Sequence, residues 1–296
     1  MKNDKKSLVL LTTSMVIFGT IGIFRRYIPW SSSLLSMIRG IIGSAFLLLF
    51  CTVTKKKFSE HLETKKLVLL IVTGALIGLN WMLLFEAYNY TTVGTATLCY
   101  YMEPTIVILL APIFFKEKLT LKKGICAALA VIGMAFVAGI VKDGIPSLDD
   151  AKGILYGLGA ALLYSIVVII NKKLPGINPY QKTMIQLLFA AVVMIPYVLF
   201  TVDFSGMEAS PVIIIMVLIV GLIHTGTAYA LYFGSMDGLK AQTVALLSYI
   251  DPVVALILSG LILGEEMGLM EIIGMVLILG ATFISETEFK KTVCEN

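Results

Sequence analysis

The feature that most constrains this chain is a series of apolar runs, separated by short breaks that hold charged residues, proline or glycine. A helix needs roughly 20 apolar residues to cross a hydrocarbon core about 30 Å thick. Hydrophobic residues make up 58% of the 296 residues and charged residues only 14%, whereas soluble domains have about 25% charged residues. The runs are too long for barrel strands and do not alternate. The sequence therefore predicts an all-α polytopic membrane protein.

The breaks between runs define ten predicted transmembrane helices joined by short connections. Their approximate ranges are 7–24, 32–53, 67–88, 92–115, 124–141, 153–171, 181–201, 211–233, 241–263 and 269–285. The first run follows a basic start, as a signal peptide does. Arg25 and Arg26 come after it in place of a small-residue cleavage site, so we expect a span.

The distribution of basic residues predicts the orientation. If the N-terminus is cytoplasmic, 18 lysines fall in cytoplasmic segments, whereas the outer segments hold only Arg25, Arg26, Lys142 and Lys152. Cytoplasmic loops of membrane proteins carry an excess of Lys and Arg. We therefore expect a multi-pass plasma-membrane protein with both termini in the cytoplasm. The same distribution accounts for the net charge of +4, so no nucleic-acid partner is predicted.

An internal repeat relates the two halves of the chain at an offset of 148 residues. Residues 83–117 and 231–265 share eight identities, and Glu103-Pro104 aligns with Asp251-Pro252. Five spans per copy is an odd number, so the second copy must enter the membrane from the opposite side. The loop at 116–123 accordingly carries a net charge of +3, and its counterpart at 264–271 carries −3. This pattern predicts two inverted five-helix repeats, 1–148 and 149–296, which are typical of secondary transporters.

The two acid-proline pairs mark the predicted centre of the molecule. Proline removes a helical hydrogen bond, and an acid in the middle of a bilayer costs at least ~2.5 kcal/mol on insertion scales. We therefore predict helix kinks at Pro104 and Pro252 that line a polar cleft near the midplane, where the two repeats meet. The alternative is structural: the acids satisfy neighbouring groups and the prolines only shape the helices.

Polar and aromatic residues near these pairs are the candidate substrate-binding residues. They are Asn80, Trp81, Tyr100, Tyr101, Glu103, Tyr229, Ser248, Tyr249 and Asp251. Aromatic rings together with carboxylates favour an amine or another organic cation.

Three residues are candidates for proton coupling: Glu103, Asp251 and His224. A lone buried histidine is more often a satisfied core residue, so His224 is the weakest of the three. Arg39, inside the second predicted span, is interpreted as a structural charge partner of a carboxylate. Binding of a substrate carboxylate is the alternative role for Arg39.

The sequence holds little that favours catalysis or metal binding. Its four cysteines form no CxxC pair, it has only two histidines, and neither GxSxG nor HExxH occurs. We therefore expect no cofactor, no metal and no enzymatic activity.

These features resemble the drug/metabolite transporter superfamily, and in particular its EamA-type members, over essentially the whole chain. The matching stretches are Phe18-Gly19-Thr20, Arg39, Glu103-Pro104, Glu117 and Gly264-Glu265. The chain departs from the usual pattern with Phe18-Gly19 where Trp-Gly is common, with Tyr164-Ser165 in the second copy, and with Gln186 at the second arginine position. The resemblance implies a transporter of small metabolites, often an exporter of amino acids or related compounds.

The leading hypothesis is a secondary transporter of amino acids, amines or related compounds that works by alternating access, with proton coupling left open. A flippase of lipid-linked substrates on the same fold is the alternative, and an intramembrane enzyme is the weakest one. The expected partners are a small-molecule solute and membrane lipid, and the chain is expected as a monomer or homodimer.

Overall fold

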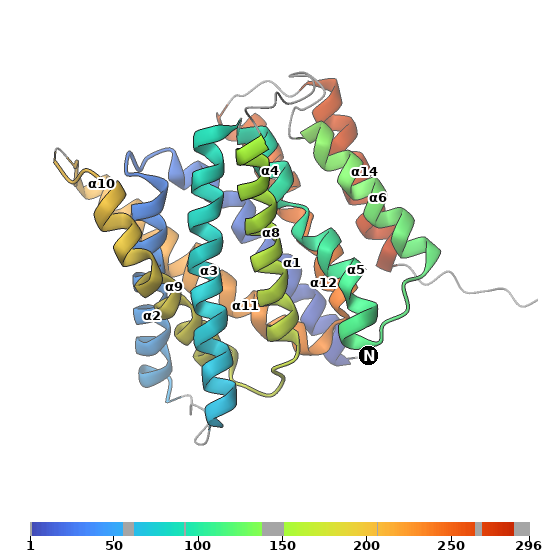
Figure 1. The fold of residues 1–296 in the computed structure, drawn as a ribbon, viewed down its shortest axis with the longest axis horizontal. Coiled ribbons are helices and arrows are strands. Elements are labelled where there is room, and N and C mark those ends of the chain that lie inside the picture. The colour runs from blue at the N-terminus through green and yellow to red at the C-terminus, as the bar shows by residue number, and fades with distance from the viewer. Residues whose placement is uncertain are drawn as a thin grey trace, which may run out of the picture.

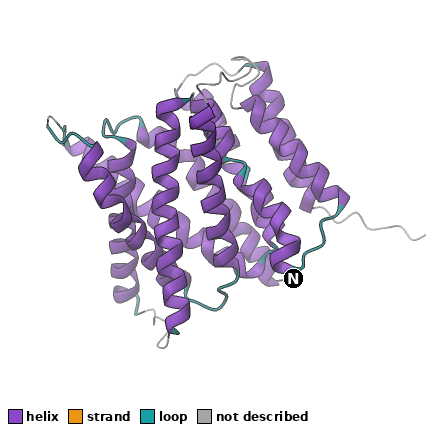
Figure 2. Cartoon of the chain, viewed as in Figure 1, coloured by secondary structure: helices purple, strands orange, loops and turns teal. Residues whose placement is uncertain are grey.

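The computed structural model describes residues 2–55, 62–91, 93–137, 151–205, 207–263 and 268–286, and regular secondary structure in these ranges is helical (Figure 2). The first half holds α1 (Lys2–Arg25), α2 (Ser32–Val53), α3 (Thr64–Tyr90), α4 (Val93–Tyr100), α5 (Glu103–Phe115) and α6 (Leu121–Val137). The second half holds α8 (Ala151–Lys172), α9 (Pro179–Thr201), α10 (Pro211–Ile219), the π-helix η2 (Val220–Thr227), α11 (Ala228–Ser235), the short 3₁₀ helix η3 (Met236–Gly238), α12 (Ala241–Ser248), α13 (Ile250–Leu258), the π-helix η4 (Ser259–Leu263) and α14 (Leu269–Glu286).

These elements follow the ten predicted spans, with boundaries that differ by a few residues at most ends. The end of the fifth predicted span, residues 138–141, lies outside the described residues. Seven helices of the described part are long and apolar enough to cross a membrane, and two shorter apolar helices, Glu103–Phe115 and Ile272–Ala281, add to them.

The outer surface of the helices is strongly apolar. Phe200 is 90% exposed, Leu261 is 75% exposed and Ile113 is 73% exposed. Such side chains are costly in water over a large contiguous area and are expected to face lipid. Together with the length of the helices, this surface confirms the predicted all-helical membrane protein.

Local sequence explains where several helices begin. Ser31, Asn178 and Ser210 are N-caps whose side chains accept hydrogen bonds from the backbone N–H groups of Leu34, Tyr180 and Ile213. Such caps satisfy N–H groups that have no partner within the helix. Proline follows directly at positions 179 and 211, where its missing N–H has no structural cost.

The fourth span of each repeat is interrupted at its acid-proline pair. α4 ends at Tyr100 and α5 begins at Glu103; α12 ends at Ser248 and α13 begins at Ile250. Each acid therefore lies in the first turn of the second segment, where the helix dipole favours negative charge. The first turn also tolerates proline, so the pair marks a new helix start within the membrane.

The two interrupted spans lie side by side and run in opposite directions. Three side-chain contacts join them: Tyr101 with Asp251, Thr105 with Tyr249, and Glu117 with Ala241. The residue numbers rise along one span while they fall along the other. The repeats are therefore inverted, as the charges of their loops predict.

The repeats pack against each other rather than forming separate bundles. α3 contacts both α8 and α9, α2 contacts α9, and α6 lies beside α14 at one edge of the molecule (Figure 1). Close approach depends on small residues: a Cβ added at Gly78 of α3 would lie 2.6 Å from the carbonyl oxygen of Ala190 in α9. Small-xxx-small patterns such as Gly74 and Gly78 permit such contacts.

The eighth span contains an element that the sequence does not predict. Between α10 and α11 the chain forms η2, in which the hydroxyls of Thr225 and Thr227 donate to the carbonyls of Val220 and Leu222, five residues earlier. η2 packs against α2. π-helical turns of this kind occur frequently at functional sites.

Candidate functional site

A cavity of about 430 Å³ lies at the two helix interruptions, between the repeats. It reaches from Glu103 and Asp251 to Arg25, Ser32 and Tyr88. The last three lie where α1 ends, α2 begins and α3 ends, and we call this side of the bundle the open end. The full lining is Met15, Phe18, Ile21, Gly22, Arg25, Ser32, Leu35, Ser36, Arg39, Trp81, Leu84, Phe85, Tyr88, Thr97, Tyr100, Tyr101, Glu103, Pro104, Tyr164, Tyr229, Tyr232, Ser248, Asp251 and Ala255.

Aromatic rings form much of the cavity wall. Tyr100 lies 5.7 Å from Tyr101 and 6.3 Å from Tyr164, measured between ring centroids. On the other side, Phe18 of α1 lies edge-on to Tyr229 at 5.0 Å and to Tyr232 at 6.3 Å. Edge-on packing of this kind holds the rings in place. The cavity is therefore bounded by rings that present faces and hydroxyls to a solute.

The cavity lining holds two arginines, Arg25 and Arg39. Arg25 donates to the backbone carbonyls of Ile28 and Trp30, whereas Arg39 contacts the neighbouring helix. Its guanidinium carbon lies 4.4 Å from the centroid of the Trp81 ring, on the neighbouring helix α3. No ion pair joins Arg39 to a carboxylate of the described residues, and its Nε has no hydrogen-bond partner there. The expected carboxylate partner is thus replaced by a cation–π contact, which leaves the charge of Arg39 available to a ligand.

The two carboxylates of the cavity have different surroundings. Asp251 Oδ2 accepts a hydrogen bond of 3.1 Å from the Tyr101 hydroxyl. Glu103 is only 5% exposed, and its Oε1 has no hydrogen-bond partner among the described residues. A buried polar atom without a partner is unfavourable. Glu103 is therefore the carboxyl group of the cavity that most needs a proton, a water molecule or a ligand.

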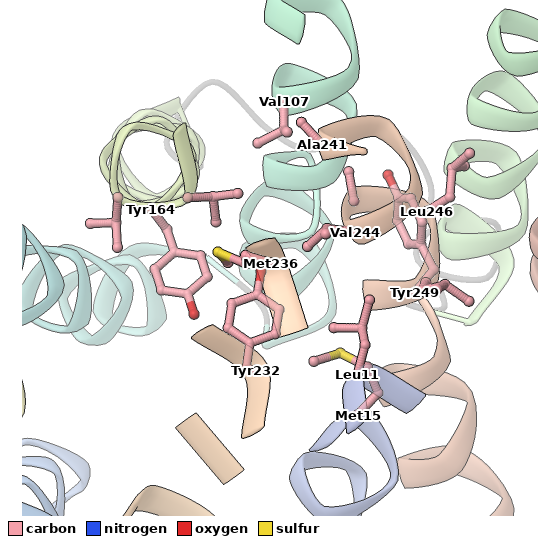
Figure 3. Packing of buried hydrophobic residues seen from close by; sticks show 14 of the residues in the cluster. Leu11, Met15, Val107, Tyr164, Tyr232, Met236, Ala241, Val244, Leu246 and Tyr249 are labelled. Carbon is pink, nitrogen blue, oxygen red and sulfur yellow. The ribbon is translucent and has the colours of Figure 1, made fainter. Parts of the chain in front are cut away.

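The other side of the bundle, where α1 begins, has a separate pocket of about 430 Å³ that shares no lining residue with the cavity. Buried side chains lie between the two, and we call this side the closed end. Figure 3 shows part of this packing: Leu11 of α1 and Val107 of α5 belong to one cluster with Val244 and Leu246 of α12 and with Tyr249, which lies between α12 and α13. All five are at most 1% exposed. This apolar layer separates the cavity from the closed end.

Polar contacts reinforce the closed end. Glu117, which follows α5, accepts hydrogen bonds from the backbone N–H groups of Ala241 at 2.8 Å and Gln242 at 3.3 Å. A residue of the first repeat thus caps the first turn of α12 in the second repeat. The Lys172 ammonium donates to the carbonyls of Met236 and Leu239, just before α12. The sequence counterpart of Glu117, Glu265, lies outside the described residues.

Most of the predicted site residues line this cavity. Trp81, Tyr100, Tyr101, Glu103, Tyr229, Ser248, Asp251, Arg39 and Pro104 do so. Pro252 is buried beside Asp251 and does not.

Three further predicted residues lie outside the cavity wall. Asn80 is fully buried and donates a hydrogen bond of 2.6 Å to the carbonyl of Ala160 in α8. Tyr249 belongs to the apolar layer of the closed end. His224 is held by the Thr20 hydroxyl, 2.8 Å from Nε2, and packs 4.8 Å from the Phe24 ring. The local surroundings of His224 are those of a satisfied core histidine.

The cavity also contains residues that the sequence did not single out as site residues. Phe85 and Tyr88 are four and seven residues after Trp81, on the same face of α3. Ser36 is three residues before Arg39, on the same face of α2. Their helical spacing relative to Trp81 and Arg39 is therefore the sequence feature from which these three cavity residues could have been predicted.

Comparison with known proteins agrees with this architecture. The model of the EamA-like transporter family matches residues 5–139 and again residues 151–287. The uncharacterized transporter YxxF of Bacillus subtilis (strain 168) is 29% identical over 280 residues, which cover 94% of this chain and 88% of that protein. Protein RarD of Escherichia coli (strain K12) is 22% identical over 274 residues, with coverage of 90% and 89%.

A solved crystal structure with 16% sequence identity has a TM-score of 0.83 and covers 94% of this chain and 97% of its own. At this identity the likeness concerns the fold. The family match extends over both halves of the chain and accompanies the inverted repeat and the cavity between the repeats. This multi-pass membrane protein belongs to the EamA-like transporter family, within the drug/metabolite transporter superfamily.

Proposed function

We propose that the protein is a secondary transporter of small amino acids, amines or related organic solutes, and that it works by alternating access without chemically changing its cargo. The two repeats, 1–148 and 149–296, are the units that move against each other. The cavity at the interrupted helices is the proposed substrate site. Such a site near the repeat interface is typical of inverted-repeat transporters.

One observation carries this proposal: a cavity of about 430 Å³ combines one available guanidinium with two carboxyl groups and a wall of aromatic rings. A zwitterionic amino acid has both an anionic and a cationic group. Its carboxylate suits the guanidinium of Arg39, and its ammonium suits the carboxyl groups and the tyrosine faces. An amine without a carboxylate binds only to the carboxyl groups and the tyrosine faces.

Alternating access also fits the difference between the two ends of the bundle. The cavity reaches the open end, whereas the apolar layer and the Glu117 cap separate it from the closed end. With both termini in the cytoplasm, as the lysine distribution predicts, the open end faces the outside. Transport then requires a second conformation in which the closed end opens.

Proton coupling is part of the proposal, and Glu103 is its first candidate. The carboxyl group lines the cavity and lacks a hydrogen-bond partner among the described residues, so either a proton or a cationic group of the solute improves its environment. Asp251 is the second candidate. His224 is less favoured because its ring nitrogens already face Thr20 and the carbonyl of Ile219.

The test is uptake by the purified protein in liposomes. A panel of labelled amino acids, the corresponding decarboxylated amines and uncharged analogues is offered with and without a pH gradient. We expect saturable uptake of at least one amino acid or amine, and stronger accumulation with the gradient. Absence of uptake for the whole panel, together with movement of a fluorescent lipid-linked sugar between leaflets, favours a flippase and contradicts the proposal.

A further inference from the structure

Two tyrosines occupy the same position in the two repeats but have different partners. Tyr101 and Tyr249 are related by the repeat offset of 148 residues. The Tyr101 hydroxyl donates to Asp251 Oδ2 across the repeat interface, at 3.1 Å. The Tyr249 hydroxyl is instead hydrogen-bonded to Thr105 Oγ1, at 2.7 Å.

The two acids that correspond in the repeats also differ in their hydrogen-bond partners. Glu103 is the repeat counterpart of Asp251. If the two repeats had the same conformation, Tyr249 would donate to Glu103 in the way that Tyr101 donates to Asp251. In this structure Tyr249 is bonded to Thr105, two residues further along α5, and Glu103 Oε1 has no partner among the described residues.

We propose that Tyr101 and Tyr249 exchange roles when the transporter changes orientation. In the conformation that opens the closed end, Tyr249 leaves Thr105 and donates to Glu103, while Tyr101 releases Asp251. The physical reason is the inverted repeat: the two halves rock against each other around a fixed site, and the difference between them is reversed when the other end opens. The Tyr101–Asp251 contact then reappears as a Tyr249–Glu103 contact. This inference rests on the proposed alternating access.

One difference between the repeats gives the exchange a direction. The repeat counterpart of Thr105 is Val253, which has no hydroxyl group. In the observed orientation both tyrosine hydroxyls have a partner, in Asp251 and Thr105. In the opposite orientation Tyr249 is bonded to Glu103, whereas Tyr101 faces Val253 and loses its partner. Tyr101 and Tyr249 are therefore positioning residues for the two acids, and Thr105 favours the observed orientation.

The experiment measures the populations of the two orientations directly. The four native cysteines are replaced by serine, and one reporter cysteine is introduced at a time. Ala255→Cys reports on the cavity, and Val244→Cys reports on the apolar layer of the closed end. The rate of reaction with a small hydrophilic thiol reagent is measured for each reporter in liposomes.

Variants with opposite expected effects make the test specific. Thr105→Val and Tyr101→Phe each remove a hydrogen bond of the observed orientation. We expect a roughly fivefold lower ratio of the Ala255→Cys rate to the Val244→Cys rate, the size expected for one net hydrogen bond. Glu103→Met removes the partner of Tyr249 in the other orientation, so the ratio is expected to rise. Glu103→Gln keeps an acceptor for Tyr249 and is expected to stay near the unsubstituted ratio.

Tyr27→Phe is the matched control, because Tyr27 is exposed and does not line the cavity. The exchange is contradicted if Thr105→Val and Glu103→Met move the ratio in the same direction, or if Tyr101→Phe behaves like Tyr27→Phe. Failure of the proposed function has a different signature. In that case Val244→Cys stays unreactive in the unsubstituted background and in every variant, with or without solute.

Discussion

The guanidinium of Arg39 lies 4.4 Å from the centroid of the Trp81 ring, so the arginine of α2 is held by an aromatic face of α3 within the cavity wall. This contact orients the charge without neutralising it. A cation over an aromatic face contributes about 0.5–2 kcal/mol, depending on how far it is desolvated. Arg39 is therefore both restrained and available to an anionic group of the solute.

Substitution of Arg39 is expected to separate two classes of solute. Arg39→Met removes the partner of a solute carboxylate, so uptake of an amino acid should fall by about 10–100-fold, the loss expected for a charged hydrogen bond of 1.5–3 kcal/mol. Uptake of the corresponding decarboxylated amine should fall much less. The measurement is initial uptake of each solute by the same liposomes. An equal loss for both solutes is the result that argues against a carboxylate-binding role.

The role of Trp81 is tested by a graded pair of substitutions. Trp81→Phe keeps an aromatic face beneath the guanidinium, whereas Trp81→Leu removes it. We expect a larger increase in KM for the amino acid with leucine than with phenylalanine, by a factor of about 3–10 relative to phenylalanine. If both variants show the same KM, the ring contributes packing only.

Glu103 and His224 are expected to differ in coupling. Glu103→Gln removes the titratable group that lines the cavity without a partner, so accumulation driven by a pH gradient should be lost while exchange of labelled for unlabelled solute continues. His224→Gln preserves a hydrogen-bonding group for Thr20 and should keep gradient-driven accumulation. Retention of accumulation in Glu103→Gln, or its loss in His224→Gln alone, contradicts this assignment.

The Glu117 cap is expected to hold the closed end shut. Glu117→Ala removes the acceptor for two backbone N–H groups of α12, a change that costs about 0.5–2 kcal/mol at helix N-caps. The reactivity of Val244→Cys should rise about fivefold as that end opens more often. Lys118→Ala, at the exposed neighbouring position, is the control and should have no effect. Equal reactivity in both variants shows that the cap does not limit opening.

Two glycines give a prediction about stability. A Cβ at Gly78 lies 2.6 Å from the backbone oxygen of Ala190, so Gly78→Ala forces α3 and α9 apart and should cost about 1–3 kcal/mol. At Gly280 in α14 a Cβ meets no described atom within 4 Å, so Gly280→Ala should be neutral or slightly stabilising. The thermal unfolding midpoint in detergent distinguishes the two. A similar midpoint for both variants contradicts the proposed close packing.

Much of the architecture follows from the sequence because its causes are local or periodic. The length of the apolar runs sets the spans, and the offset between Glu103-Pro104 and Asp251-Pro252 reveals the repeat. The opposite charges of the equivalent loops predict the inversion that the Tyr101–Asp251 and Thr105–Tyr249 contacts display. The helix interruptions also follow, because proline has no N–H group.

The arrangement of the site was harder to predict from the sequence, because it depends on which helix faces meet. Sequence cannot decide whether Arg39 meets a carboxylate or the Trp81 ring, since both lie on other helices. Asn80 adjoins Trp81 in sequence but points to the carbonyl of Ala160 in α8. The π-helix η2 leaves the hydropathy of its span unchanged and therefore has no signal in the apolar pattern.

The central claim is that the solute passes through the cavity between the repeats. The most direct measurement uses the protein in which the native cysteines are replaced by serine and Ala255→Cys is introduced. Its transport is measured before and after complete reaction with a bulky thiol reagent, so that each preparation serves as its own reference. We predict that labelling abolishes uptake and that an excess of the transported solute slows the labelling. Undiminished uptake after complete labelling would contradict the claim, because a blocked cavity could not then be the route.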